Sequence, residues 1–366
     1  MSSKLKISVF GSRGIPNIQG GVERHCENLY PLLSSRYKIA CFRRRPYVND
    51  KNKQWQNIHC IDLPSTKIKG VEALVHSFLS AIICIFRRPD IVHIHNIGPG
   101  MFTPLLRLFG LKVVLTYHSP NYEHAKWNFW QKKILRFSEY CALNFANQII
   151  FVNQAQHKKN SANYAHKSHC IPNGVILPPL FSESTEYIQS LGLMGEKYIL
   201  AVGRITPEKG FDYLIKAYSQ LNHNSRLVIA GGIDHNTAFS KQIVQRAQEN
   251  NVILTGFVTG APLYQLYANA SLFILPSYNE GHPIALLEAM SYDLPVIVSD
   301  IPANLAIDLP QDVYFPVGNE EKLMEKLRDI IEQNPEKRKY HLDNYQWDHI
   351  AQQTAEVYER MRKIEQ

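Results

Sequence analysis

The sequence lacks any apolar run long enough to cross a membrane as a helix. Its most apolar stretch, residues 71–86, has sixteen residues and includes Glu72 and His76, whereas a spanning helix needs about 20 apolar residues. The first eleven residues also lack the apolar core of a secretory signal. We therefore expect neither a membrane-spanning segment nor a secretory leader.

Cysteines are few, and none has the CxxC or CxxxC spacing of a metal site. All six lie in the first half of the chain, mostly in apolar runs. This distribution favours free buried thiols over a disulfide framework or a zinc site, and it predicts a reducing, cytoplasmic location. The residues are Cys26, Cys41, Cys60, Cys84, Cys141 and Cys170.

Acidic residues are scarce in the first half. Residues 1–180 hold 24 Lys and Arg against 8 Asp and Glu, whereas residues 181–366 hold 16 against 24. A basic half favours a negative neighbour: anionic lipid, a lipid pyrophosphate or nucleic acid. Solvation, or attraction between the two halves, is the alternative. We interpret the asymmetry as peripheral contact with an anionic membrane and expect no nucleic-acid partner.

The chain does show a regular alternation of strand-like and helical patterns. A length of 366 residues suits two domains, and the alternation predicts α/β domains built on parallel sheets. We expect domains over residues 1–175 and 176–345 and a terminal helix over 346–366. The expected strands are 6–10, 38–42, 58–62, 91–94, 113–117, 149–152, 198–202, 227–230, 252–254, 272–275 and 296–298.

The segment 272–290 combines a buried strand, a turn and a helix. Pro283 suits the first position of that helix, because its missing N–H would be unpaired there. Glu280 then lies in the loop after the strand, and Glu288 lies on the helix. The first amides of the helix, from residues 284 to 286, form a pocket suited to phosphate. Carboxylates beside an anion site predict a ligand with phosphates and hydroxyls, as in a nucleotide sugar.

Two other loops follow predicted strands. Residues 203–210 carry Arg204 and Lys209, fixed cations that suit a departing diphosphate. Residues 11–23 end in Gly20 and Gly21, which open a helix and let backbone approach a ligand. The spacing of this loop is not G-x-G-x-x-G, so a dinucleotide site is poorly supported.

Histidines end two further strands of the first half. His93 and His95 face the same side of a strand, a spacing that can bind metal. No acidic or cysteine partner accompanies them, so we interpret them as lining for an acceptor site. His118 ends the next strand. It could donate a hydrogen bond to a sugar hydroxyl or a leaving phosphate, or it could be a neutral structural histidine.

Four separated motifs together resemble the retaining GT4-type glycosyltransferases, which have the GT-B fold of two Rossmann-like domains facing a cleft. The amino-terminal motif resembles one subgroup that builds bacterial polysaccharides and includes rhamnosyltransferases. In GT-B enzymes a terminal helix often crosses back to the first domain. The motifs are Gly14-Ile15-Pro16 with Gly20-Gly21-x-Glu23, Ile171-Pro172-Asn173-Gly174-Val175, Gly203-Arg204 with Lys209-Gly210, and Glu280-x7-Glu288.

The resemblance implies a role for each candidate residue and no metal or other cofactor. The catalytic residues would be His118 and Glu280. Diphosphate contacts would come from Gly20, Gly21, Arg204, Lys209, Ile284 and Ala285. Glu288, Gly256 and Phe257 would bind the nucleoside, and His95, Asn121, Tyr122 and Glu123 would lie on the acceptor side.

The implied reaction moves a hexosyl or deoxyhexosyl group from a UDP-, dTDP- or GDP-sugar to a saccharide acceptor. A lipid-linked acceptor in cell-envelope polysaccharide synthesis is expected from the family and the charge. The segment Gly281-His282-Pro283 departs from what is typical of the rhamnosyltransferases, so the transferred sugar stays open. A GT-B epimerase of nucleotide sugars and a non-catalytic nucleotide-sugar-binding protein are the alternatives.

Overall fold

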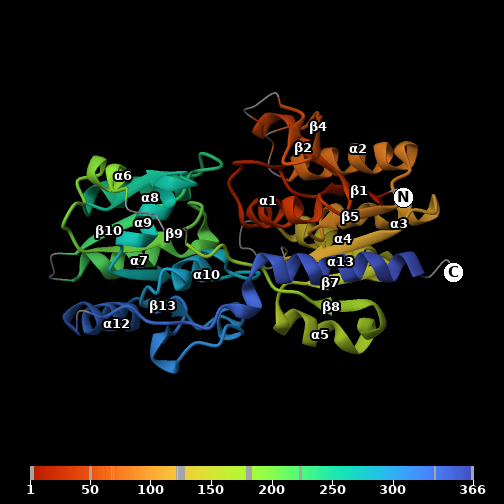
Figure 1. The fold of residues 1–366 in the computed structure, drawn as a ribbon. Coiled ribbons are helices and arrows are strands. Elements are labelled where there is room, and N and C mark those ends of the chain that lie inside the picture. The colour runs from red at the N-terminus through yellow and green to blue at the C-terminus, as the bar shows by residue number, and fades with distance from the viewer. Residues whose placement is uncertain are drawn as a thin grey trace. The chain divides into compact units, whose positions relative to one another are not determined.

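The chain forms two compact units, each an α/β domain (Figure 1). The computed structural model describes residues 4–48, 52–66, 68, 70–120, 122, 128–178, 184–221, 225–333 and 335–363. The first unit comprises residues 1–174 and 347–366, and the second comprises residues 175–346. The chain therefore crosses between the units twice, in each case one residue from the boundary expected from the sequence.

The first unit contains an eight-stranded sheet in the order β3-β4-β2-β1-β5-β6-β7-β8. Its neighbouring strands are parallel except for the β3–β4 pair. The strands are β1 Lys6–Phe10, β2 Lys38–Arg44, β3 Gln54–Trp55, β4 Ile58–Leu63, β5 Ile91–His95, β6 Val113–Tyr117, β7 Gln148–Phe151 and β8 Ser168–Cys170. The helices are α1 Gly21–Leu33, α2 Val71–Arg87, α3 Thr103–Leu108, α4 Phe129–Phe145, α5 Gln154–Tyr164 and α13 Trp347–Lys363.

Two buried clusters hold the helices of the first unit to its sheet. Central strands β5 and β6 are buried along their whole length, as expected of a parallel sheet that is covered on both faces. One cluster joins the sheet to α1 and α13, and the other joins it to α2, α3 and α4. Helix α13 lies beside α1 (Figure 1). The predicted return of the terminal helix to the first domain is thus confirmed.

The second unit contains a six-stranded parallel sheet in the order β11-β10-β9-β12-β13-β14. Its strands are β9 Tyr198–Val202, β10 Arg226–Ala230, β11 Ile253–Gly256, β12 Leu272–Leu275, β13 Val296–Ser299 and β14 Tyr314–Phe315. Its helices are α6 Glu186–Ser190, α7 Phe211–Ser219, α8 Ala238–Glu249, α9 Ala261–Asn269, α10 Ile284–Ser291, α11 Pro302–Leu305 and α12 Glu320–Gln333. This is the doubly wound arrangement expected of a Rossmann-like domain.

Each sheet has one point where the strand order reverses. In the first unit it lies between β1 and β5, and in the second between β9 and β12. Loops that leave neighbouring parallel strands diverge there and open a crevice at the carboxyl ends, which is where open α/β sheets bind ligands. The motifs of residues 11–23, 203–210 and 276–283 all follow one of these four strands.

The short strands β3, β8 and β14, of two or three residues, were not predicted, because so few residues carry no periodicity. Pro283 is the residue before the first helical position of α10 rather than the first itself. Five cysteines are buried and Cys170 is exposed, and all six are free thiols. Among the described residues, no helix combines the length and the apolar character needed to cross a membrane.

Candidate active site

The loops after β9 and β12 bring a lysine and a glutamate of the second unit together. Lys209 Nζ lies 2.6 Å from Glu280 Oε1, which also accepts a hydrogen bond of 2.6 Å from Ser277 Oγ. The two charged side chains are only 18% and 11% exposed, so the pair is shielded from water more than a surface ion pair is. Both contacts use the same carboxylate oxygen, so within the described part of the chain Glu280 Oε2 takes part in neither contact.

Glycines let these two loops approach each other. Gly210 has φ +68°, and a Cβ built on it would overlap the carbonyl oxygen of Pro276. Gly231, after β10, would similarly overlap the carbonyl oxygen of Gly203. The Tyr278 amide donates to the Glu208 carbonyl at 2.9 Å, joining the loops by backbone. Lys209 and Glu280 are therefore placed by rigid main chain.

The other predicted donor residues occupy the same end of the sheet of the second unit. Arg204 Nη1 donates to Asp234 Oδ2 at 2.8 Å. Glu288 Oε2 accepts from the Tyr267 hydroxyl at 3.0 Å, which orients this half-buried carboxylate. Gly256 ends β11 with φ +71°, and Phe257 beside it is 44% exposed, as a surface offered to a flat base would be. Asp234 and Tyr267 were missed, because no spacing marks them.

The start of α10 offers fewer amides than predicted. The Leu286 amide donates to the Pro283 carbonyl at 3.1 Å, so it is already used within the helix. Ile284 and Ala285 are the first two residues of α10, and their amides precede the intrahelical bonds. The expected phosphate pocket is thus limited to Ile284 and Ala285.

In the first unit, Gly20 and Gly21 begin α1 next to a buried carboxylate. Glu23 Oε1 accepts from the Arg13 amide at 2.8 Å. A Cβ on Gly20, which has φ +145°, would overlap the other oxygen of Glu23, whereas Gly21 has nothing within 4 Å of its Cβ position. The Glu23 carboxylate therefore holds the loop in place. Of the two glycines, Gly21 is the one with open space at its Cβ position.

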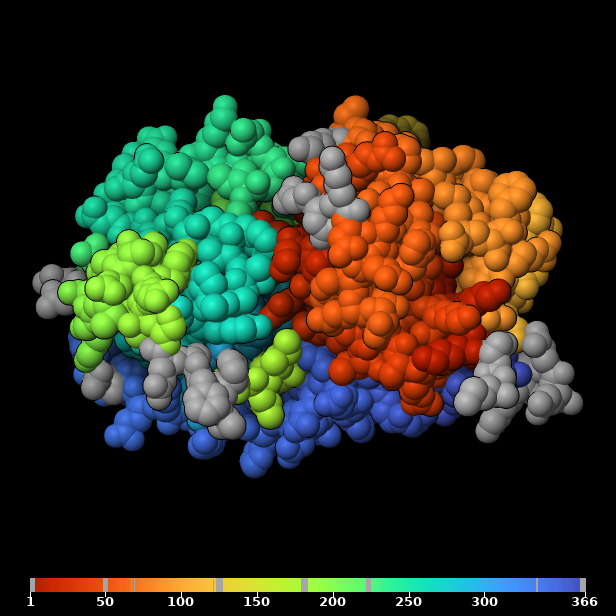
Figure 2. Space-filling model, turned by 45° about the horizontal axis from the view of Figure 1, so that its top comes forward, coloured from red at the N-terminus to blue at the C-terminus, as the bar shows by residue number. Residues whose placement is uncertain are grey.

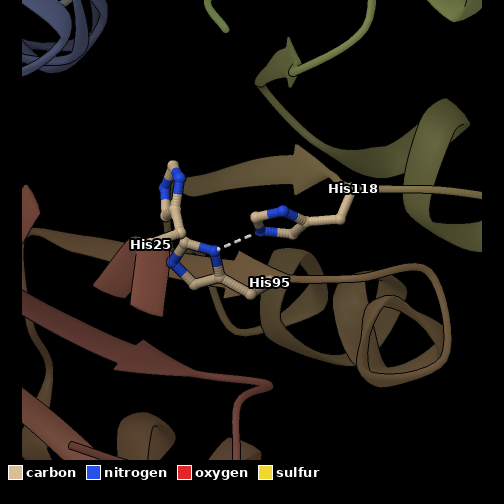
Figure 3. Close-up of side chains that lie close together, drawn as sticks. All are labelled: His25, His95 and His118. Carbon is tan, nitrogen blue, oxygen red and sulfur yellow. Dashed lines mark hydrogen bonds between the residues drawn. The ribbon is translucent and has the colours of Figure 1, made fainter. Parts of the chain in front are cut away.

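Histidines from three elements meet at the carboxyl ends of β5 and β6 (Figure 3). His95 Nδ1 and His118 Nε2 are 3.0 Å apart. His25 of α1 stands edge-on to both rings, with centroids at 5.4 and 5.0 Å. His25 Nδ1 is 2.8 Å from Asn173 Oδ1. Asn173 belongs to the Ile171–Val175 motif, so that motif helps to build this cluster.

Burial keeps these imidazoles neutral. It lowers the pKa of His25 to about 4 and that of His93 to about 3, and it holds the pKa values of His95 and His118 well below the usual range. His93 and His95 stack at 4.6 Å on one side of β5, as their spacing predicted. Each ring thus carries a single proton at neutral pH.

His25, His95 and His118 have nitrogens within 4.8 Å of one another, a spacing that could hold a metal ion. The chemistry of the set is that of three neutral imidazoles, which suit Zn²⁺. However, the facing nitrogens of His95 and His118 already share a hydrogen bond. A metal would have to replace the proton between them, so the arrangement fits a hydrogen-bonded pair.

The acceptor-side residues are only partly described. His95 is fully buried and therefore contacts other side chains of the cluster. The hydroxyl of Tyr122 is 3.4 Å from Glu139 Oε1, and Arg136 lies over the Tyr122 ring. Asn121 and Glu123 lie outside the described residues. His25 was missed by the sequence reasoning, because it sits mid-helix, where one histidine carries no signal.

These features define a class: two doubly wound domains, one with a lysine–glutamate pair at its switch point and the other with a cluster of neutral histidines. The model "Glycosyltransferase Family 4" matches residues 19–177, and "Glycosyl transferases group 1" matches residues 183–347. The chain belongs to the GT4-type glycosyltransferases of GT-B fold.

Three relatives of the chain are also named as glycosyltransferases. An uncharacterized glycosyltransferase of Methanocaldococcus jannaschii is 32% identical over 192 residues, 49% of each chain. The chain thus spans about half of that relative. Another from the same organism is 24% identical over 358 residues, covering 93% of this chain and 95% of its own. The N,N'-diacetylbacillosaminyl-diphospho-undecaprenol alpha-1,3-N-acetylgalactosaminyltransferase of Campylobacter jejuni is 27% identical over 241 residues, 61% and 62% of the two chains.

Solved structures show the same fold at low identity. Sucrose-phosphate synthase from Thermosynechococcus elongatus has a TM-score of 0.83 at 21% identity, over 99% of this chain and 100% of that one. The Anabaena protein HepE in complex with UDP-glucose has a TM-score of 0.77 at 17% identity, over 97% and 100%. Both cover the two domains, so the GT-B fold is confirmed. Enzymes of this family retain the configuration of the transferred sugar and need no metal.

Proposed function

We propose that this enzyme moves a hexosyl or deoxyhexosyl group from a nucleoside-diphosphate sugar to a lipid-linked saccharide, in the synthesis of a cell-envelope polysaccharide. The Lys209–Glu280 pair at the β9–β12 switch point carries the proposal. A cation is fixed where a diphosphate would leave, and a carboxylate oxygen is free for the sugar beside it. HepE, of similar fold, was solved with UDP-glucose.

In the proposed donor complex, Lys209 and Arg204 bind the diphosphate, together with the amides of Ile284 and Ala285. Glu288 accepts from ribose hydroxyls, and Gly256 and Phe257 lie at the base. As the bond to the sugar breaks, negative charge grows on the leaving phosphate, and preorganised cations stabilise that charge without a metal. Lys209 has three N–H donors, so it can hold Glu280 and a phosphate oxygen at once.

The acceptor hydroxyl attacks the anomeric carbon on the face from which the diphosphate leaves, which retains the configuration. Its proton passes to the departing phosphate oxygen, so no carboxylate base is assigned. His118 contributes a hydrogen bond from the first domain. The basic charge of that domain, 27 Lys and Arg against 12 Asp and Glu, favours an acceptor with a pyrophosphate-lipid carrier, such as the one named in the Campylobacter relative.

An apolar surface over α2, α3 and α4 supports a lipid-linked acceptor. Helix α2 buries several polar residues, Glu72, His76, Ser77 and Ser80, while five of its large apolar residues are exposed. The α2–α3 part is visible on the surface of the first unit in orange (Figure 2). Helix α3 packs against both other helices. This α2–α4 surface exposes Val71, Leu74, Val75, Phe78, Phe86, Leu108, Phe109, Phe129, Trp130, Ile134, Phe137 and Tyr140.

Cations accompany these aromatic side chains. Lys133 Nζ lies 4.6 Å from the centre of the Phe129 ring and 5.3 Å from that of Trp130. Arg87 ends α2, and Arg88 follows it. Exposed aromatic residues with Lys and Arg beside them are typical of a surface that lies in an anionic membrane interface. We propose peripheral attachment to the cytoplasmic side of the membrane, where nucleotide sugars and free thiols such as those here coexist.

Glu280→Ala tests the donor site. The variant should lose transfer by about 100-fold or more, because a contact to the transferred sugar made in the transition state is removed. Binding of UDP, dTDP or GDP, measured by calorimetry after a thermal-shift screen, should remain within a few-fold, since Lys209 and Arg204 are intact.

Glu320→Ala is the matched control, because Glu320 pairs with Lys216 in the same unit, away from the β9–β12 switch point, and it should change neither quantity. Equal retention of transfer and binding in Glu280→Ala would contradict the role of Glu280. A new sugar nucleotide formed without acceptor would identify an epimerase instead, and tight binding with no turnover would identify a binding protein.

A further inference from the structure

A chain of hydrogen bonds runs through the core of the first unit and ends at His118. The His95 ring bonds His118 through Nδ1 at 3.0 Å and the Tyr30 hydroxyl through Nε2 at 2.5 Å. The Tyr30 hydroxyl is also 3.0 Å from His93 Nδ1, which is 2.6 Å from the Tyr358 hydroxyl. His93 Nε2 is 2.7 Å from Thr116 Oγ1. The chain therefore joins α1, β5, β6 and α13.

The number of protons in this chain is limited. All the imidazoles and both tyrosines are buried, and burial disfavours the charged form of each. A neutral imidazole has one N–H and one lone pair, and a hydroxyl donates once. The hydrogen bond between His95 Nδ1 and His118 Nε2 therefore contains a single proton, so the two rings adopt complementary tautomers.

The chain has two possible directions, and the distance between Tyr30 and His95 distinguishes them. If His118 donated to His95, then His95 Nε2 would donate to Tyr30. The Tyr30 proton would then go to the Tyr358 oxygen, with which Tyr30 also interacts, or to His93 Nδ1 at 3.0 Å. In that direction the contact of 2.5 Å between the Tyr30 hydroxyl and His95 Nε2 would have an N–H donor, whose usual distance is about 2.7–3.2 Å.

In the opposite direction the short contact has a hydroxyl donor, as its length requires. Tyr358 donates to His93 Nδ1, and His93 Nε2 donates to Thr116. Tyr30 donates to His95 Nε2 at 2.5 Å, its shorter contact, and His95 Nδ1 donates to His118 Nε2. The proton of His118 is then on Nδ1. Among the described residues, that nitrogen has no hydrogen-bond partner, and the side chain retains 6% exposure.

We propose that Tyr30, His93, His95 and Tyr358 are positioning residues that hold His118 in its Nδ1–H tautomer, so that His118 presents a fixed donor, and not a base, to the reacting sugar or phosphate. This inference rests on the proposed function only for the identity of the ligand. It agrees with a same-face transfer in which the phosphate takes the acceptor proton. The chain also links His118 to the terminal helix, because Tyr358 lies on α13.

The direct test is two-dimensional NMR of the full-length protein labelled with 15N-histidine. In the wild type, His118 should show a pyrrole-type Nδ1 and a pyridine-type Nε2. Tyr30→Phe removes the donor to His95 and should produce a mixture of His118 tautomers. Tyr37→Phe is the matched control: Tyr37, which lies between α1 and β2, also contacts α13, but its hydroxyl donates to Glu359, so the histidine signals should not change.

Kinetics give a second readout. Tyr30→Phe should lower kcat by about tenfold, less than the roughly 10²–10⁴-fold contributed by a group that itself transfers the proton, because Tyr30 acts only through His95, and KM for the donor should be unchanged. If Tyr30→Phe fails to fold, Tyr358→Phe serves, because without that hydroxyl Tyr30 can turn from His95 to His93. A pyrrole-type Nε2 on His118 in the wild type would overturn the proposal. So would one zinc ion per chain in the purified protein, since the metal would replace the shared proton. The NMR result needs no turnover, so the proposal can stand even if the proposed transfer fails.

Discussion

The two units share one topology, yet the side chains at their switch points have opposite chemistry. At the β9–β12 switch point, the second unit holds a charged pair, Lys209 and Glu280, each partly open to water. At the β1–β5 switch point, the first unit holds neutral, buried rings centred on His95. A leaving diphosphate needs fixed charge, whereas a sugar beside a breaking bond needs oriented hydrogen bonds. The comparison teaches that the fold supplies the crevice and the loops supply the chemistry.

The largest expected difference between the units is in their stability at low pH, where the first unit should lose more than the second. His25, His76 and His93, all buried in the first unit, have pKa values lowered to about 4, 3 and 3. The unfolded chain takes up these protons below pH 6.5, while the folded unit does so only near the lowered values. Their contribution is therefore complete above pH 6.5 and is lost as the pH falls toward 4 and 3. By pH 5 the loss is about 2 kcal/mol for each histidine.

Hydrogen exchange at pH 7.5 and pH 5, corrected for intrinsic rates, measures this loss of stability. Peptides from β1, β5 and β6 should lose protection before peptides from β9 and β12. His76→Leu should reduce the pH-dependent loss by about 2 kcal/mol, whereas the same change at the exposed His166 should not alter it. Equal loss in both units would contradict the difference between them.

Substitution of one glycine in each unit should have a smaller effect on stability and allows the units to be compared directly. A Cβ at Gly210 would overlap the Pro276 carbonyl oxygen, and one at Gly11 would overlap the His95 carbonyl oxygen. Gly192 has φ +67° with nothing within 4 Å, so Gly192→Ala measures the φ cost alone, about 1 kcal/mol. Gly210→Ala and Gly11→Ala should each cost a further 1–3 kcal/mol or so.

Thermal unfolding measures these losses of stability, and ligand binding shows which site each substitution affects. Gly210→Ala should weaken nucleoside-diphosphate binding, because it displaces the Lys209 loop. Gly11→Ala should leave that binding unchanged and should instead alter the His95 and His118 NMR signals. Identical effects of all three substitutions would show that close approach at the switch points does not matter.

The smallest expected effect concerns the surfaces. The double substitution Phe78→Ser with Trp130→Ser should weaken binding to anionic vesicles about tenfold, because it removes large apolar side chains from the α2–α4 surface. Met194→Ser with Leu305→Ser, exposed at 53% and 50% in the second unit, is the control. Co-sedimentation at low and high salt is the measurement. Undiminished vesicle binding, or a shift from dimer to monomer instead, would assign the surface to another role.

Much of the fold was predictable, because parallel strands are continuous apolar runs and glycine-bearing loops punctuate them. The strands at 6–10, 113–117, 198–202 and 272–275 have the predicted bounds. The sequence could bring candidate residues together where a motif is local, as in the loop with Arg204 and Lys209. It could not do so where contacts join distant segments: Tyr30 and Tyr358 meet His93 across 63 and 265 positions, and no spacing encodes that. The exposure of apolar residues on α2 could not be predicted either, since periodicity does not say which side of a helix is buried.

The place of α13 has a consequence for how the protein is made. Trp347 and Tyr358 belong to the core of the first unit, although they follow the whole of the second. On the ribosome, most of the first unit is synthesised early, but its core cannot be completed until α13 has been synthesised. At about 5–20 residues per second, the intervening segment 175–346 delays closure by roughly 10–35 s. The second unit can thus fold before the first is complete, and a chain that ended before α13 would retain the loops of Lys209 and Glu280 yet lack Tyr358.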